Sequence, residues 1–358
     1  MSGSAAGRAF IGSFTSAGGP GIVVADIDPR TGALTRTGAV RSVPDPSYLA
    51  VGHGEAGPVL YAVSETVAGV VAAYDASGAV PRPLGEPVPV GGDEPTHLAL
   101  AQGHLLTANY GSGSVSVLPL TAEGLPLPPS AVLHHEGSGP DPERQRSPHA
   151  HQVVPDPSGR WVLAVDLGTD SVQVCSLDER TGAMRPHGAT ALPPGTGPRH
   201  LAFHPSGDHA YVLGELRPTV TVCRWDAAAG VLRAIGETSL LPDSPDSPDS
   251  PDGADGQAQP SAPVVAPDGR YLWTAVRGPD TVVVLALDAS GERAEPVTAV
   301  PCGGRRPRDL VLDPAGRRLY AANERSGEVT WLDVDHATGI PRPAGSLTVP
   351  AASSVAFG

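Results

Sequence analysis

Four residues able to bind anions or move protons recur at matching places in successive segments of the chain. His151 and Arg199 each stand at the beginning of the first strand-like run of their segment, and Glu215 and Arg277 each stand at the end of the second run of theirs. Imidazole and carboxylate groups accept protons, whereas arginine binds carboxylates and phosphates through charge-assisted hydrogen bonds. A base beside a bound anion suits proton transfer on a small anionic substrate.

Several other kinds of chemistry lack the residues that they need. All 24 basic residues are arginine, which excludes Schiff-base chemistry and a P-loop lysine. No GxSxG motif occurs, and the GxGxxG at 52–57 precedes a strand-like run, so we interpret it as a turn. His149 and His151 have no third ligand with clear spacing, so we expect no metal and no cofactor. Cys175 and Cys223 stand in similar runs, SVQVC and TVTVC, and we expect them to be buried packing residues.

The candidate residues belong to a repeat that runs through the whole chain. Residues 308–343 contain four short β-rich runs separated by turns, and similar units begin near residues 47, 96, 151, 199, 261 and 308. Residues 8–35 lack a first strand, and residues 353–358 supply one. We therefore predict an all-β, seven-bladed β-propeller over 1–358, with four-stranded blades and a ring closed by the C-terminal strand pairing into the N-terminal blade.

Two insertions depart from this repeat. Residues 136–148 form an irregular segment that leads to His149. Residues 242–257 are acidic and of low complexity, and we expect them to be a mobile, solvated loop.

In a propeller, the beginning of each first strand and the end of each second strand face the central tunnel, so equivalent positions form two rings. The first ring is Ser47, Thr96, His151, Arg199, Ser261, Arg308 and Ser353. The second ring is Phe14, Glu65, Tyr110, Leu167, Glu215, Arg277 and Glu324. The concentration of chargeable residues in neighbouring blades favours a catalytic tunnel over a purely structural one.

Structural roles compete with the catalytic interpretation. His151 can be a core histidine, and the ring arginines can pair with carboxylates such as Glu324 to tie blades together. His97 and His200 lie one residue beyond the first ring, so strand alternation should turn them away from the face of Arg199. Because tunnel-mouth side chains contribute little to packing, we expect substitutions of the catalytic candidates to leave the fold intact.

At these residues the sequence resembles the lactonase-type seven-bladed β-propellers, which include bacterial 6-phosphogluconolactonase and the fungal carboxymuconate-lactonising enzyme. The resemblance lies in SPHAHQ at 147–152, GPRHLAFHPSG at 197–207, YVLGEL at 211–216, APDGRYLW at 266–273 and PRDLVLDPAG at 307–316. Val276 and Pro263 stand where family members usually have Asn and Glu. The resemblance implies that the active-site residues are His151, Arg199, Glu215 and Arg277. We expect the substrate-binding residues to be His149, Gln152, Arg308 and Glu324.

The expected activity is metal-independent hydrolysis of a small anionic lactone, similar to that of a 6-phosphogluconolactonase. His151 or Glu215 would be the general base, and Arg199 and Arg277 would hold the anionic group and stabilise the oxyanion. One alternative is a lyase or isomerase that opens or forms a ring on a small carboxylate without net water. A second is a non-catalytic interaction scaffold, which an aromatic content of 4% does not favour.

Charge and hydropathy also limit the partners. A net charge of -14 argues against a nucleic-acid or anionic-membrane partner. No apolar N-terminal region or run of membrane length occurs, so we expect a cytoplasmic protein. We expect a monomer or weak homodimer.

Overall fold

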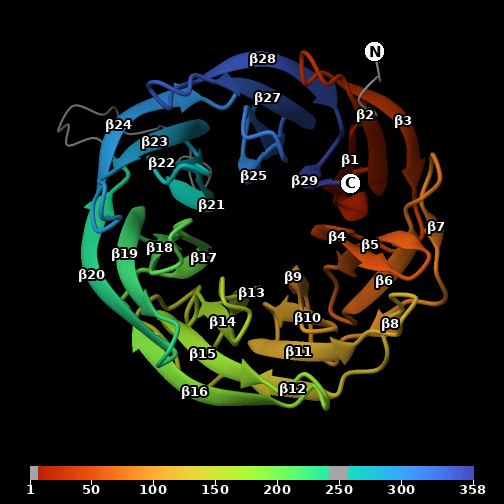
Figure 1. Ribbon diagram of the computed structural model, residues 1–358, viewed down its shortest axis with the longest axis horizontal. Coiled ribbons are helices and arrows are strands. Elements are labelled where there is room, and N and C mark those ends of the chain that lie inside the picture. The colour runs from red at the N-terminus through yellow and green to blue at the C-terminus, as the bar shows by residue number, and fades with distance from the viewer. Residues whose placement is uncertain (1–6, 242–256) are drawn as a thin grey trace.

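Short β-branched runs between glycine- and proline-containing turns become the strands of a ring of β-sheets. The computed structural model describes residues 7–241 and 257–358, and Figure 1 shows their sheets arranged around a central tunnel. The acidic segment 242–257, expected to be mobile, lies outside the described residues except for Gln257. Among the described residues no helix is long and apolar enough to cross a membrane.

Each blade is an antiparallel sheet whose strands follow one another from the tunnel outward. Blade three consists of β9 (Pro95–Ala101), β10 (His104–Asn109), β11 (Ser114–Pro119) and β12 (Ala131–His134). Blade four consists of β13 (Ala150–Pro155), β14 (Trp161–Asp166), β15 (Ser171–Leu177) and β16 (Met184–Ala191), and blade five of β17 (Pro198–Phe203), β18 (His209–Gly214), β19 (Thr219–Asp226) and β20 (Val231–Ser239). Blade six consists of β21 (Gln259–Val265), β22 (Tyr271–Arg277), β23 (Thr281–Leu287) and β24 (Ala294–Pro301), and blade seven of β25 (Pro307–Leu312), β26 (Arg318–Asn323), β27 (Glu328–Val334) and β28 (Pro341–Thr348).

The first blade joins the two ends of the chain. It consists of β29 (Ala352–Phe357), β1 (Gly7–Ser13), β2 (Ile22–Ile27) and β3 (Leu34–Val40), with a short 3-10 helix at Thr15–Ala17. β29 pairs with β1 from Ala9↔Phe357 to Ser13↔Ala352, and the C-terminus lies inside the ring beside β1 (Figure 1). The predicted ring closure is therefore confirmed.

The second blade differs at its outer edge. It consists of β4 (Leu49–Gly54), β5 (Gly57–Ser64), β6 (Val70–Asp75) and two very short strands, β7 (Arg82–Pro83) and β8 (Val88–Pro89), which both pair with β6. Proline cannot donate to a sheet, so the proline-rich run that contains these strands divides the outer strand into two pieces. β4 ends at Gly54 and β5 begins at Gly57, so the segment 52–57 contains a hairpin whose turn is residues 55–56, in agreement with the predicted turn between two strands.

Local turn chemistry sets the ends of the strands. In the seventh blade, Gly316 has a φ of 69°, a conformation that glycine adopts without strain. The Asp313 side chain accepts hydrogen bonds from the backbone N–H groups of Arg317, at 2.6 Å, and Arg318, at 3.1 Å. The turn therefore stops β25 and starts β26 at fixed residues.

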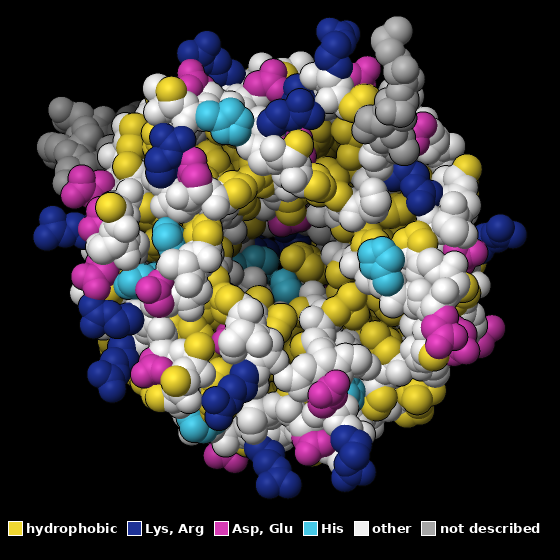
Figure 2. Space-filling view, viewed as in Figure 1, with side chains coloured by type: hydrophobic (Ala, Val, Ile, Leu, Met, Phe, Trp, Pro, Cys, Tyr) yellow, Lys and Arg dark blue, Asp and Glu magenta, His cyan; other side chains and the backbone are white. Residues whose placement is uncertain are grey.

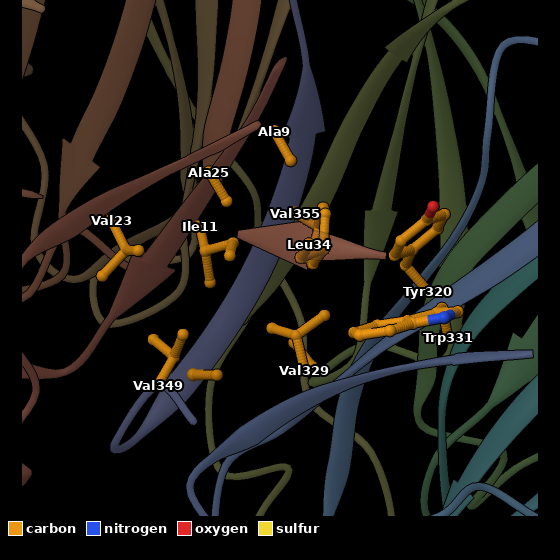
Figure 3. Close-up of a cluster of buried hydrophobic side chains, with 12 residues drawn as sticks. Ala9, Ile11, Val23, Ala25, Leu34, Tyr320, Val329, Trp331, Val349 and Val355 are labelled. Carbon is orange, nitrogen blue, oxygen red and sulfur yellow. The ribbon is translucent and has the colours of Figure 1, made fainter. Parts of the chain in front are cut away.

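The hydrophobic core lies between the faces of adjacent blades. Between blades seven and one, Ile11 and Val355 pack with Tyr320 and Trp331 (Figure 3). The Tyr320 hydroxyl donates a hydrogen bond to the Gly32 carbonyl at 2.8 Å, so this large buried ring is satisfied. Cys175 and Cys223 are likewise buried in clusters that join neighbouring blades, which confirms their packing role.

Candidate active site

A cavity of about 270 Å³ lies where the two rings of tunnel positions meet. Four arginines and two glutamates are among its lining residues, so a protein with a net charge of -14 presents a positively charged pocket. Figure 2 shows the hollow at the centre of the ring, with histidine side chains visible inside it. The lining residues are Glu65, Thr96, Tyr110, Arg144, His151, Glu215, Gln259, Arg277, Arg306 and Arg308.

First-ring residues enter the tunnel because β-bulges aim them there. The pairing of β17 with β18 shifts between Pro198 and His200, so Arg199 is the extra residue of a bulge. In five other blades an equivalent shift in the strand pairing leaves the first-ring residue unpaired; these residues are Thr96, His151, Ser261, Arg308 and Ser353. A bulge re-aims the side chain of its extra residue. Each blade of this group therefore delivers one side chain to the axis.

The Glu215 carboxylate binds three arginines. Its Oε1 lies 2.8 Å from Arg144 Nη2, and its Oε2 lies 3.0 Å from Arg199 Nε and 2.7 Å from Arg277 Nη2. Burial raises the pKa of Glu215, but the charges of Arg277, Arg199 and Arg144 outweigh burial and hold it well below its usual value. Burial and repulsion by Arg277 lower the pKa of Arg199 to about 9, which leaves it charged at neutral pH.

His151 lines the cavity and is only 6% exposed. Burial, together with the charges of Arg199 and Arg308, lowers its pKa well below 6.5. Its imidazole is therefore neutral at physiological pH, and its Nδ1 forms no hydrogen bond with the described residues. A neutral imidazole in an arginine-rich pocket is able to accept a proton.

Two residues that complete the site were not selected from the sequence. Arg144 comes from the irregular insertion at 136–148 and donates hydrogen bonds to Glu215 and, at 3.1 Å, to the Tyr110 hydroxyl. The repeat placed Tyr110 in the second ring, so its position near the site could be inferred from the sequence. Arg144 lies outside the repeat, and the sequence showed only that it is a basic residue in an insertion next to the site.

The other expected residues are divided between the cavity and its surroundings. Arg308 lines the cavity, where its Nη2 lies 3.1 Å from Glu65 Oε1 and its guanidinium lies 4.8 Å from the Phe14 ring centroid. Glu324 does not line it but lies 3.7 Å from Arg308 Nη1. Arg199 is not among the lining residues, and its side chain, 3% exposed, contacts the lining residue Glu215. The expected direct contact between Arg199 and the substrate is therefore not supported by its position.

Gln152 and His149 lie behind the site. The Gln152 side chain donates to the Leu201 carbonyl at 3.3 Å and accepts from the Leu201 N–H at 2.7 Å, which ties β13 to β17. The expectation that Gln152 binds substrate is corrected, because both of its polar atoms are used between blades. His149 stacks on Tyr110, with ring centroids 4.4 Å apart, and its Nδ1 lies 2.9 Å from the Tyr110 carbonyl oxygen.

The alternation argument for His200 was wrong. Because Arg199 is a bulge residue, strand alternation is interrupted there, and the His200 ring centroid lies 5.2 Å from that of His151. His97 lies 5.4 Å from His200 and 4.2 Å from Tyr48 between ring centroids. These rings form a buried aromatic layer against His151. Within 7–241 and 257–358, no group of three His, Cys, Asp or Glu side chains is arranged to hold a metal ion.

Comparison with known proteins identifies the class to which this fold and site belong. Residues 8–357 match the family described as "Lactonase, 7-bladed beta-propeller". The chain is 34% identical over 336 residues to a 6-phosphogluconolactonase of Bacillus subtilis, which covers 92% of each chain. The chain belongs to the seven-bladed β-propeller lactonases, enzymes that hydrolyse a cyclic carboxylic ester.

Solved structures agree with this assignment. A Bacteroides fragilis protein provisionally assigned as a 6-phosphogluconolactonase superposes with a TM-score of 0.89 at 28% identity, covering 100% of this chain and 99% of that one. The periplasmic gluconolactonase of Pseudomonas aeruginosa gives 0.85 at 29% identity, with 98% of both chains covered. The predicted fold and family are therefore confirmed.

Proposed function

We propose that the protein hydrolyses a small sugar lactone that carries an anionic group, with a phosphorylated gluconolactone as the leading substrate. The observation that carries the proposal is the Glu215 carboxylate bound by three arginines beside a neutral His151. A cavity of about 270 Å³ has room for one sugar ring with its substituents. The Bacillus subtilis relative is named for this substrate, and the Pseudomonas aeruginosa structure is that of a gluconolactonase.

His151 is the proposed general base. It removes a proton from water while the water oxygen bonds to the lactone carbonyl carbon, and the Arg277 guanidinium stabilises the negative charge that develops on the carbonyl oxygen. The bond from that carbon to the ring oxygen then breaks, and the imidazolium returns the proton to the departing alcohol. The product is an open hydroxy acid, and no metal ion takes part.

Glu215 is the less suitable base, although the sequence left both choices open. Arg144 occupies its Oε1, and Arg199 and Arg277 occupy its Oε2, whereas His151 Nδ1 forms no hydrogen bond with the described residues. Its proposed role is to hold Arg277 and Arg144 in position. Both arginines line the cavity, so fixing them there preorganises the charge that meets the substrate.

The test is acid release from 6-phosphogluconolactone in a pH-stat, with the wild type and two variants. His151→Asn should lower kcat about a hundredfold or more, the scale of a lost general base. Arg277→Gln should weaken transition-state binding about tenfold to a hundredfold through loss of a charged hydrogen bond. His53→Asn, at an exposed residue of the β4–β5 hairpin, is the matched control. Unchanged turnover in His151→Asn would remove this site.

The same experiment separates the competing activities. A lyase or isomerase would convert a ring compound without net acid release, and a scaffold would convert none.

Dialysis against EDTA should leave the activity unchanged, because the proposed mechanism needs no metal. Loss of activity that added Mg²⁺ or Zn²⁺ restores would contradict it.

A cytoplasmic location and a monomeric or weakly dimeric state complete the proposal. The three cysteines, Cys175, Cys223 and Cys302, are free and buried, which suits a reducing compartment. The large exposed apolar side chains lie in several different blades and not in one block; they are Val67, Val80, Leu127, Ile235, Leu241 and Val297. Cell fractionation and light scattering on the purified protein test the two statements, and the Pseudomonas aeruginosa gluconolactonase shows that a periplasmic location occurs among similar proteins.

A further inference from the structure

Arg306 enters the cavity from the loop before β25 in a left-handed backbone conformation. Its φ is 60°, in the left-handed region that favours glycine. Its N–H donates to Asp280 Oδ1 at 2.7 Å, and its carbonyl accepts from the Glu324 N–H at 3.1 Å. The equivalent position in blade five is Gly197, with a φ of 53°. Asp45, Glu94 and Ala351 hold the equivalent place in other blades and also have a positive φ, so the conformation belongs to the repeat. In blade seven the repeat places an arginine that lines the cavity at this position.

The Arg306 guanidinium donates no hydrogen bond to the described residues. Of the four arginines that line the cavity within the described chain, Arg144, Arg277 and Arg308 each donate a side-chain hydrogen bond, and Arg306 donates none. Its nearest charge partner is Glu324 Oε2, 3.9 Å from its Nε, which is too far for a hydrogen bond. The side chain is 31% exposed, so its donors are available to a ligand.

Arg306 also stands where the catalytic cavity meets a neighbouring groove. A groove of about 620 Å³ is lined by Arg306 and Glu324 together with the loops at 325–327 and 348–351. Arg306 lines both spaces. A substrate whose ring lies near His151 and Arg277 could therefore extend its far end toward Arg306.

We propose that Arg306 recognises a phosphate monoester on the part of the substrate remote from the lactone ring, and so sets the preference for phosphorylated over unphosphorylated lactones. The inference rests on the lactonase function proposed above. Near neutral pH a phosphate monoester carries close to two charges and three acceptor oxygens, which match the several donors of a guanidinium. The arginines around Glu215 are already engaged by that carboxylate, whereas Arg306 has its hydrogen-bonding capacity free.

The first test compares two lactones in three variants. Arg306→Gln and Arg306→Gly should raise KM for 6-phosphogluconolactone about tenfold to a hundredfold and leave kcat, and KM for glucono-δ-lactone, unchanged. Arg305→Gln removes the same charge from an adjacent exposed residue that does not line the cavity, and it should change neither KM. Equal effects of Arg306→Gln on both lactones, or no effect, would overturn the proposal.

The glycine variant separates recognition from stability. Because glycine accepts a φ of 60°, Arg306→Gly should melt at or above the wild-type temperature although it loses the phosphate preference. A lower melting temperature with an unchanged KM would assign Arg306 a structural role only.

A binding measurement distinguishes failure of this inference from failure of the proposed function. Calorimetry should show that the wild type binds 6-phosphogluconate at least tenfold more tightly than gluconate, and that Arg306→Gln abolishes this difference. If the wild type hydrolyses neither lactone but shows this pattern, the reaction is wrong and the phosphate site stands. If the wild type and Arg306→Gln bind 6-phosphogluconate equally, or neither binds it, the phosphate site is refuted.

Discussion

Glu215 connects parts of the chain that are far apart in sequence. Its carboxylate binds Arg199 at the beginning of blade five, Arg277 at the end of β22 and Arg144 in the insertion at 136–148. The side chains of Glu215, Arg199 and Arg277 are 3%, 3% and 5% exposed. Removing the carboxylate leaves two buried guanidinium groups without their counter-ion, which is far more costly than losing a surface pair.

Glu215→Gln should therefore destabilise the fold as well as the site. The expected loss is about 3–5 kcal/mol, the usual cost of breaking a buried ion pair on one side. This replaces the sequence-based expectation that substitutions at the tunnel mouth leave stability unchanged. Thermal unfolding followed by circular dichroism measures it, with Glu55→Gln on an exposed turn as the control. Identical melting curves for Glu215→Gln and the wild type would contradict the result.

The pH dependence of turnover should reflect the lowered pKa of His151. An ordinary histidine base loses activity below a pKa of about 6.5. Burial and the nearby arginines hold the pKa of His151 well below that value, so it stays unprotonated as the pH falls through 6.5. We expect kcat to remain flat from about pH 8 to about pH 6. An inflection near 6.5 that disappears in His151→Asn would show that its pKa is ordinary.

The sequence identified the part of the site that follows the repeat. His151 is a first-ring residue and Glu215 and Arg277 are second-ring residues, and the structure brings all three to one cavity. Arg144 and Arg306 lie in connecting loops, which carry no periodicity. Gln152 was misjudged because hydrogen bonding across blades depends on a neighbouring strand that the local sequence does not reveal.

At the scale of single elements, the inner strands combine regular pairing with one irregular residue each. The bulge at Arg199 places that side chain and His200 in the buried region of the tunnel, so both are nearly inaccessible. Turn and strand signals predicted where the inner strands begin to within a few residues. They did not predict the bulges, because an extra residue leaves no mark in an apolar pattern.

The innermost strand of the first blade should be essential for folding. Deleting residues 353–358 removes most of β29, including buried Val355, and leaves the edge of β1 unpaired. We expect severe destabilisation and aggregation, measured by melting temperature and by size-exclusion chromatography. Removing Gly358 alone, which is exposed, is the control. A soluble deletion variant that melts near the wild-type temperature would show that the ring does not depend on this closure.

At the scale of the whole molecule, the buried histidines make the fold sensitive to acid. Burial and the charge of Arg199 lower the pKa of His97 to about 3, and the pKa values of His151 and His200 are also far below 6.5. The unfolded chain binds protons at these residues at a higher pH than the folded chain does. Their stabilising contribution is thus present above a pH of about 6.5 and is lost as the pH falls below it.

One buried acid acts in the opposite direction. Burial raises the pKa of Asp309 to about 6, so its contribution is present at low pH and is lost as the pH rises through 6. Three histidines outweigh one aspartate, and the melting temperature should fall between about pH 7 and pH 5. Calorimetry at several pH values measures the trend, which His200→Gln should reduce. A melting temperature that rises on acidification would refute it.

The pairing of β1 with β29 also determines when, during synthesis, the exposed edge of β1 is covered and can no longer pair with another chain. At a translation rate of about 5–20 residues per second, the edge of β1 waits roughly 20–70 s for its partner. Phe10 and Ile11, both fully buried in the finished ring, lie on that waiting strand. Ribosome-bound chains stalled before residue 352 should be cleaved by protease within the first blade, whereas released chains resist. A strand made much later thus protects β1, and we expect the nascent chain to need protection of this edge for the whole time in which residues 14–351 are made.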